Sequence, residues 1–60
     1  MYEMIVVDDE AELREGISSY FPWESLNIHV VGVFENGRAA LSYIKTHPVD
    51  IVLTDVRMPF

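Results

Sequence analysis

Three aspartates directly follow two short apolar runs of this chain. Asp8 and Asp9 come after residues 4–7, and Asp55 comes after residues 51–54. If the two runs form adjacent parallel strands, the three carboxylates meet at one end of a sheet. Two unit charges about 4 Å apart repel each other by roughly 4 kcal/mol at an effective dielectric constant near 20. Either one carboxylate holds a proton or a cation neutralises the cluster, so this end of the sheet is the expected functional site.

Short runs rich in apolar and β-branched residues predict three strands that would position these aspartates. The strands cover residues 3–8, 28–34 and 50–54. The first run is continuous rather than alternating, which is typical of a strand covered on both faces of a parallel sheet. Residues 57–60 are expected to leave the third strand as a loop.

A first helix is predicted over residues 10–21. Asp9 is the expected N-cap, with Glu12 at the third helical position in a pattern that resembles a capping box. Pro22 ends the helix, because the residue before a proline disfavours helical geometry. The helix presents one apolar stripe at helical spacing, formed by Leu13, Ile17, Tyr20 and Phe21. Residues 22–27 then form a connection that has room for one helical turn.

A second helix is predicted to start at Asn36-Gly37 and to end at Thr46, before Pro48. Asn-Gly can also signal a β-hairpin. The helical interpretation is preferred because apolar residues follow at helical spacing, namely Ala40, Leu41 and Ile44.

The resulting order, βαβαβ with short connections, predicts an α/β fold with a parallel sheet. Ligands of such sheets bind at the carboxyl ends of the strands, where all three aspartates fall. A sheet with so apolar a third strand needs cover on both faces and both edges, so residues 1–60 are expected to be the first half of a larger doubly wound domain. In the 60-residue form, the open edge of the third strand is expected to pair with a second copy, giving a homodimer or an aggregate.

The composition of the chain argues against several classes of function and site. Ten acidic and four basic residues give a formal charge of −6, which argues against direct nucleic-acid binding by this segment. The absence of cysteine excludes disulfides and thiolate zinc sites and fits a reducing compartment such as the cytoplasm. The apolar runs are too short to span a bilayer, and the N-terminus does not resemble a signal peptide, so no membrane association is expected.

Three motifs together resemble the receiver domain of two-component response regulators. They are Val6-Val7-Asp8-Asp9-Glu10, Glu35-Asn36-Gly37 with Ala40-Leu41, and the run Asp-Ile-Val-Leu-Thr-Asp-Val-Arg-Met-Pro at residues 50–59. The resemblance covers the whole chain but only the first half of a receiver. It implies a flavodoxin-like fold with the first strand between the second and the third. Residues 22–26, Pro-Trp-Glu-Ser-Leu, resemble the subset of receivers fused to AraC-type DNA-binding domains.

The resemblance also implies a role for each acidic residue. Asp55 matches the phosphoacceptor, Asp9 the direct ligand of Mg²⁺, Asp8 the acid that holds the ion through water, and the Arg57 backbone carbonyl a further ligand. The implied partner is a sensor histidine kinase, and the implied output is transcription control by another domain. Carboxylate and carbonyl oxygens suit Mg²⁺ better than zinc or copper. The chain is accordingly expected to be a cytoplasmic signalling module and not an enzyme.

Two parts of a receiver have no match in residues 1–60. These are the Ser or Thr after the fourth strand and the Lys after the fifth, and neither Thr54 nor Lys45 matches those motifs. The 60-residue chain is therefore expected to bind Mg²⁺ but to be phosphorylated poorly and not to switch.

Other interpretations compete with this one. One is a magnesium-dependent phosphatase or phosphotransferase of another α/β class. Enzymes of the haloacid-dehalogenase type also use a strand-end aspartate, but their second aspartate lies two residues after the first rather than next to it. Asp8 and Asp9 can also be read as a strand end and a helix cap. His29 and His47 are interpreted as surface or structural residues. Trp23, with Tyr20 and Phe21, is expected to pack against the end of the first helix.

Overall fold

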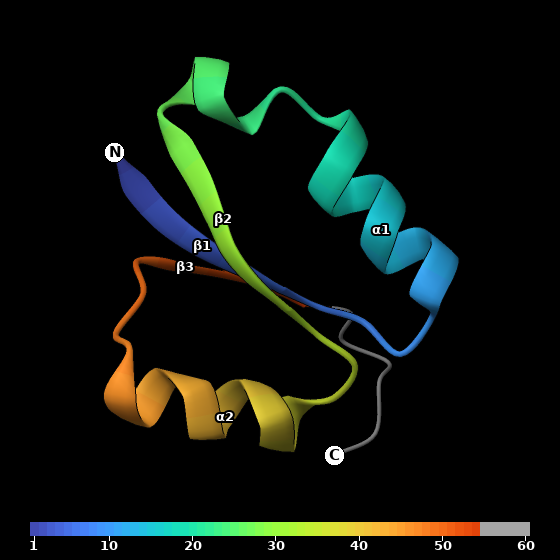
Figure 1. Cartoon of the computed structure of the whole chain (residues 1–60), viewed down its shortest axis with the longest axis vertical. Coiled ribbons are helices and arrows are strands. Elements are labelled where there is room, and N and C mark those ends of the chain that lie inside the picture. Colours follow the sequence, from blue (N-terminus) through green and yellow to red (C-terminus); the bar gives the residue numbers. More distant parts are fainter. Residues whose placement is uncertain (55–60) are drawn as a thin grey trace.

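The computed structural model describes residues 1–54 of the chain, and the predicted loop at residues 57–60 lies outside them. Strands and helices alternate as the sequence predicts (Figure 1). The elements are β1 (Tyr2–Val7), α1 (Ala11–Tyr20), the 3₁₀ turn η1 (Trp23–Leu26), β2 (Ile28–Phe34), α2 (Gly37–Thr46) and β3 (Ile51–Thr54). Within the described part, neither helix is both long and apolar enough to cross a membrane.

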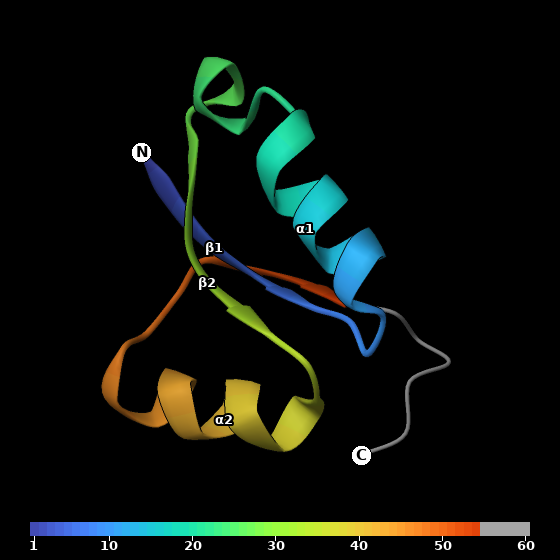
Figure 2. The same cartoon turned by 45° about the vertical axis from the view of Figure 1, so that its right-hand side comes forward.

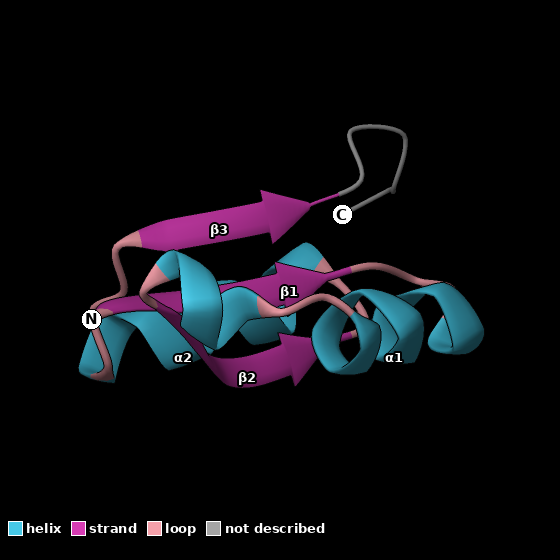
Figure 3. Cartoon of the chain, turned by 90° about the horizontal axis from the view of Figure 1, so that it is seen from above, coloured by secondary structure: helices cyan, strands magenta, loops and turns pink. Residues whose placement is uncertain are grey.

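The three strands form one parallel sheet in the order β2-β1-β3 (Figure 3). This confirms the predicted α/β fold and the flavodoxin-like placement of β1 at the centre. Val7 at the end of β1 pairs with Phe34 of β2 and with Thr54 of β3, so the three carboxyl ends lie at one edge of the sheet. The β1–β2 register shifts between Met4 and Ile5, because β2 contains one extra residue there, Val31.

The core is built on β1, whose last four residues are almost fully buried. Alternate side chains point to opposite faces of the sheet. Ile5 and Val7 contact Ala40 of α2 on one face, and Val6 shares a small cavity with Leu13 and Ile17 of α1 on the other. Figures 1 and 2 show the two helices on opposite sides of the strands. Full burial of such a side chain is worth about 1.5–3 kcal/mol, which explains the continuous apolar run of β1.

The boundaries of β1 and β3 differ from the prediction by one residue. Asp8 lies beyond β1, and Asp50 lies before β3. The Asp50 amide donates to the Glu3 carbonyl at 2.9 Å, while the Glu3 amide donates to the Asp50 carboxylate oxygen Oδ2 at 2.8 Å. The side chain of Asp50 thus takes a hydrogen bond that a backbone carbonyl would otherwise accept, so the regular ladder starts at Ile51.

The start of α1 corrects the predicted cap. Glu10, not Asp9, occupies the N-cap position, and its side chain makes no capping hydrogen bond. The physical reason is the neighbouring Asp8, whose Oδ1 accepts from the Glu10 amide at 2.9 Å. This hydrogen bond between a side chain and the backbone two residues later closes a tight turn through Asp9, and the helix begins after the turn.

The predicted apolar stripe of α1 is also only partly correct. Ile17 is half-buried, but Tyr20 is 87% exposed. Trp23 instead covers the last turn, because its indole Nε1 donates to the Ile17 carbonyl at 2.7 Å and its ring lies 5.4 Å from that of Phe21. The predicted packing of Trp23 against the end of the helix is therefore confirmed, and so is the helical turn after Pro22.

The second helix follows the prediction closely. Asn36 is the N-cap of α2, and its side-chain oxygen accepts from the Ala39 amide at 2.8 Å. Ala40 is buried against β1, and Tyr43 places its ring 5.2 Å from that of Phe34. The hairpin alternative for Asn36-Gly37 is excluded.

Candidate functional site at the carboxyl ends of the strands

Asp8 lies at the end of the central strand and is almost completely buried, with 4% of its surface exposed. Its amide donates to the Phe34 carbonyl at 3.0 Å, which ties the start of the loop to β2. Its carboxylate oxygen Oδ1 accepts from the Glu10 amide at 2.9 Å. Within residues 1–54 the other oxygen, Oδ2, accepts no hydrogen bond. One oxygen of the carboxylate therefore fixes the loop to the start of α1.

Asp9 follows in the same loop with an exposed side chain. Asp55 and Arg57 lie outside the described residues, so the sheet geometry is complete only up to Thr54, which precedes Asp55 in the sequence. Because Thr54 pairs with Val7, β1 and β3 end side by side. The structure thus brings Asp8 and Asp9 to the edge at which β3 ends.

The residues at this edge fit a hard cation. Both described acids offer carboxylate oxygen, the donor that Mg²⁺ prefers. Burial of Asp8 lowers the local dielectric constant and strengthens its attraction for a cation. Among residues 1–54 no cluster of three metal-ligating side chains occurs, since the third acid of the predicted set is beyond them.

Arg14 contacts the acidic loop, and this contact was not predicted from the sequence. Its guanidinium Nη1 donates to the Asp8 carbonyl at 2.7 Å. A signal was present in the sequence, since side chains of a helix lean toward its N-terminus and Arg14 lies one turn after Glu10. That signal alone does not identify the acceptor, because the path of the loop depends on Asp8 itself.

The two histidines lie away from the acidic loop. His29 is near the start of β2, opposite Glu3, and its Nδ1 is 3.8 Å from a carboxylate oxygen of Glu24. His47 follows the end of α2, where its ring stacks on Tyr43 with 4.5 Å between the ring centroids. These placements agree with their interpretation as surface or structural residues.

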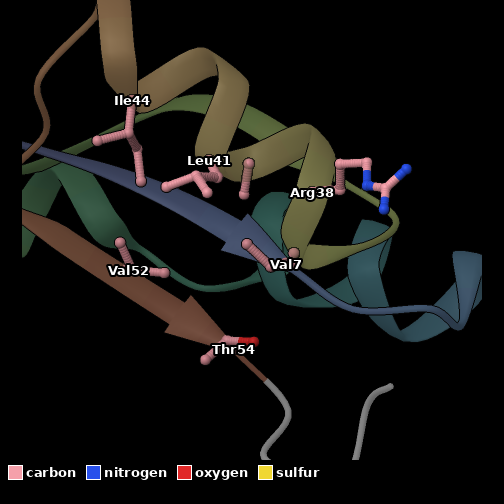
Figure 4. A pocket seen from close by; sticks show the side chains of 8 residues that line it. Val7, Arg38, Leu41, Ile44, Val52 and Thr54 are labelled. Carbon is pink, nitrogen blue, oxygen red and sulfur yellow. The ribbon is translucent and has the colours of Figure 1, made fainter. Parts of the chain in front are cut away.

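An apolar groove of about 420 Å³ lies between α2 and β3, on one side of the acidic edge. Figure 4 shows Leu41 and Ile44 of α2 on one wall and Val7 and Val52 of the sheet on the other. Leu41 is 56% exposed and Val52 is 46% exposed. The groove offers apolar contacts rather than catalytic groups.

Comparison with known proteins agrees with the fold. A family model described as the response regulator receiver domain matches residues 4–60. The chain belongs to this family. Membership favours a signalling role over the haloacid-dehalogenase-type alternative.

Similar proteins are found among curated sequences and solved structures. An uncharacterized response regulatory protein of Staphylococcus epidermidis is 41% identical over 98% of this chain and 24% of its own length. The transcriptional regulatory protein HptR of Staphylococcus aureus is 36% identical over 98% of this chain and 23% of its own. The REC domain of AraT, a response regulator from Geobacillus stearothermophilus, is 37% identical with a TM-score of 0.87, over 98% of this chain and 46% of that one. The chain therefore spans about a quarter of the length of these curated relatives.

Proposed function

We propose that this chain carries the phosphoacceptor site of a response regulator, with Asp55 as the acceptor. A carboxylate oxygen of Asp55 attacks the phosphorus of a phosphohistidine on a sensor kinase. The P–N bond breaks, the imidazole leaves with the bonding electron pair, and an aspartyl phosphate forms. The observation that carries the proposal is the buried, loop-fixing Asp8 at the end of β1, beside the end of β3 that leads into Asp55.

The same loop is proposed to hold Mg²⁺ through Asp9 directly and Asp8 through water, together with Asp55 and the Arg57 carbonyl. When bound, the ion neutralises the negative charge on the phosphoryl oxygens. The protein's own contribution is to hold the carboxylates in place, because Asp8 is anchored to both β2 and the start of α1. Because the carboxylate is already held in place, less conformational freedom is lost when the ion binds.

The proposed output is transcription control in the longer protein. Relatives that bear the name transcriptional regulatory protein support this, since this chain matches only about a quarter of their length. The formal charge of −6 argues that another part of such a protein would contact DNA. The cytoplasm is the expected compartment.

The test is phosphorylation by acetyl phosphate, with and without Mg²⁺, read by intact mass. We expect a low-occupancy, Mg²⁺-dependent phosphoryl adduct on the chain and none on Asp55→Asn. The matched control is Asp50→Asn, since Asp50 precedes β3 and its side chain accepts from the Glu3 amide, a hydrogen bond that an asparagine oxygen can also accept. An unchanged adduct on Asp55→Asn would refute the assignment. An adduct seen only on a longer receiver would mean that the site needs residues beyond these 60.

We further infer that the 60-residue form pairs with a second copy through β3. Among residues 1–54, β3 is hydrogen-bonded on one side alone, to β1, and the apolar groove lies beside it, between β3 and α2. A strand edge with unpaired amides and carbonyls is a template for another strand. Sedimentation over a range of protein concentrations tests the inference, and a monomer at every concentration would contradict it.

A further inference from the structure

Arg14 has an unusual position for a cationic residue. It closes the first turn of α1, near the helix N-terminus, whose partial positive charge favours anions rather than cations. Its side chain is nevertheless half-buried, whereas its helix neighbours Leu13 and Glu15 are exposed. The Nη1 hydrogen bond to the Asp8 carbonyl, at 2.7 Å, offsets this unfavourable placement.

This hydrogen bond is the third anchor of Asp8. The amide of Asp8 is tied to β2 through Phe34, and its Oδ1 is tied to the Glu10 amide. If Arg14 were removed, the Asp8 carbonyl would be left without a protein partner among the described residues, and a partly buried polar group without a partner is destabilising. The turn through Asp9 would then lose its fixed geometry, because the Asp8 carbonyl would turn to accept hydrogen bonds from water.

We propose that Arg14 is a positioning residue that fixes the Asp8-Asp9 loop for cation binding. The inference rests on the Mg²⁺ role proposed above. Two effects of Arg14 oppose each other: its hydrogen bond holds the loop, while its charge repels a nearby cation. Because Nη1 contacts the loop backbone directly, we expect the positioning effect to be the larger one.

The two effects of Arg14 change Mg²⁺ affinity in opposite directions, so a Mg²⁺ titration can distinguish them. The titration is followed through the amide NMR signals of the loop. Arg14→Met removes both the hydrogen bond and the charge, and we expect Mg²⁺ affinity to fall by about tenfold, as for other groups that orient metal ligands. Arg14→Lys keeps the charge and a donor and should restore most of the affinity. Lys45→Met, a matched loss of charge in the last turn of α2, should leave it unchanged. Tighter binding by Arg14→Met would overturn the proposal, because it would mean that only the charge matters.

A second measurement does not depend on the metal. In the Mg²⁺-free chain, Arg14→Met should accelerate hydrogen exchange of the Glu10 amide, which is bonded to Asp8 Oδ1, and leave the Ile5 amide in the core unchanged. Unchanged exchange at Glu10 would refute the positioning role. Faster exchange combined with no Mg²⁺ binding by the unmodified chain would support the positioning role and refute the proposed metal site, so the two failures are distinguishable.

Discussion

Gly32 stands where the sheet leaves the least room for a side chain. A Cβ atom at this position would come within 2.8 Å of the Phe34 ring and 3.5 Å of the Ile5 side chain. The Phe34 ring is itself held against Tyr43, so it has little freedom to move away. A hydrogen is therefore the side chain that the core accepts here.

We predict that Gly32→Ala lowers the free energy of unfolding by about 1–3 kcal/mol, the usual effect of overpacking a core. The matched substitution is Gly16→Ala in α1, where a Cβ would meet the Tyr20 ring at an ordinary 3.7 Å. Because alanine favours a helix over glycine, Gly16→Ala should stabilise the chain by up to about 1 kcal/mol. Urea unfolding of both variants measures the difference, and equal effects would contradict this account.

Asp8 shows how far individual residues could be interpreted from the sequence. Its position at the end of a buried strand was predictable, because the apolar run before it is continuous. Its bond to the Glu10 amide was not, since Asp9 has the same side chain and stands closer to the helix. The choice between them depends on β2, because the bond from the Asp8 amide to Phe34 orients the loop. Arg14 escaped prediction for the same reason.

The two helices differ in how well the sequence near each helix predicts its cap and its buried side chains. In α2, Asn36 caps the helix through the nearby Ala39 amide, and Ala40 lies on the face that the helical spacing of apolar residues predicts. The prediction of this element was confirmed. In α1, no residue is fully buried, and its end is covered by Trp23 from the following turn. The predicted apolar stripe of α1 was therefore wrong at the end of the helix, because tertiary packing rather than periodicity decides which side chains are exposed there.

We predict that Asn36→Ala lowers the free energy of unfolding by about 1 kcal/mol, because the Ala39 amide loses its side-chain acceptor. Asn36→Ser supplies another capping oxygen and should retain most of the stability. The comparison is best made by thermal unfolding followed by circular dichroism. Equal losses in the two variants would show that the side chain of Asn36 acts through something other than the cap.

For the molecule as a whole, net charge and apolar surface act in opposite directions on self-association. Two copies that each carry a formal charge of −6 repel each other, while the groove beside β3 favours contact. Salt screens the repulsion between exposed charges and leaves apolar contacts in place. The proposed pairing should therefore strengthen as ionic strength rises.

We predict that Val52→Lys weakens this association, because Val52 lines the groove and is 46% exposed. Val33→Lys is the matched control, since Val33 lies on β2, away from β3, and is 40% exposed. Sedimentation velocity at low and high salt should separate the variants. Equal behaviour of the two would place the contact somewhere other than β3.

The extra residue of β2 gives the two borders of the sheet different properties. Within the described residues, β3 is a regular border strand, whereas β2 is bent by the bulge at Val31. A bulged border resists the addition of a further strand, because its amides and carbonyls no longer follow an even ladder. Two copies joined through β3 would present a bent β2 at each outer side. Assembly should then stop at a closed two-fold pair and not continue into a fibre.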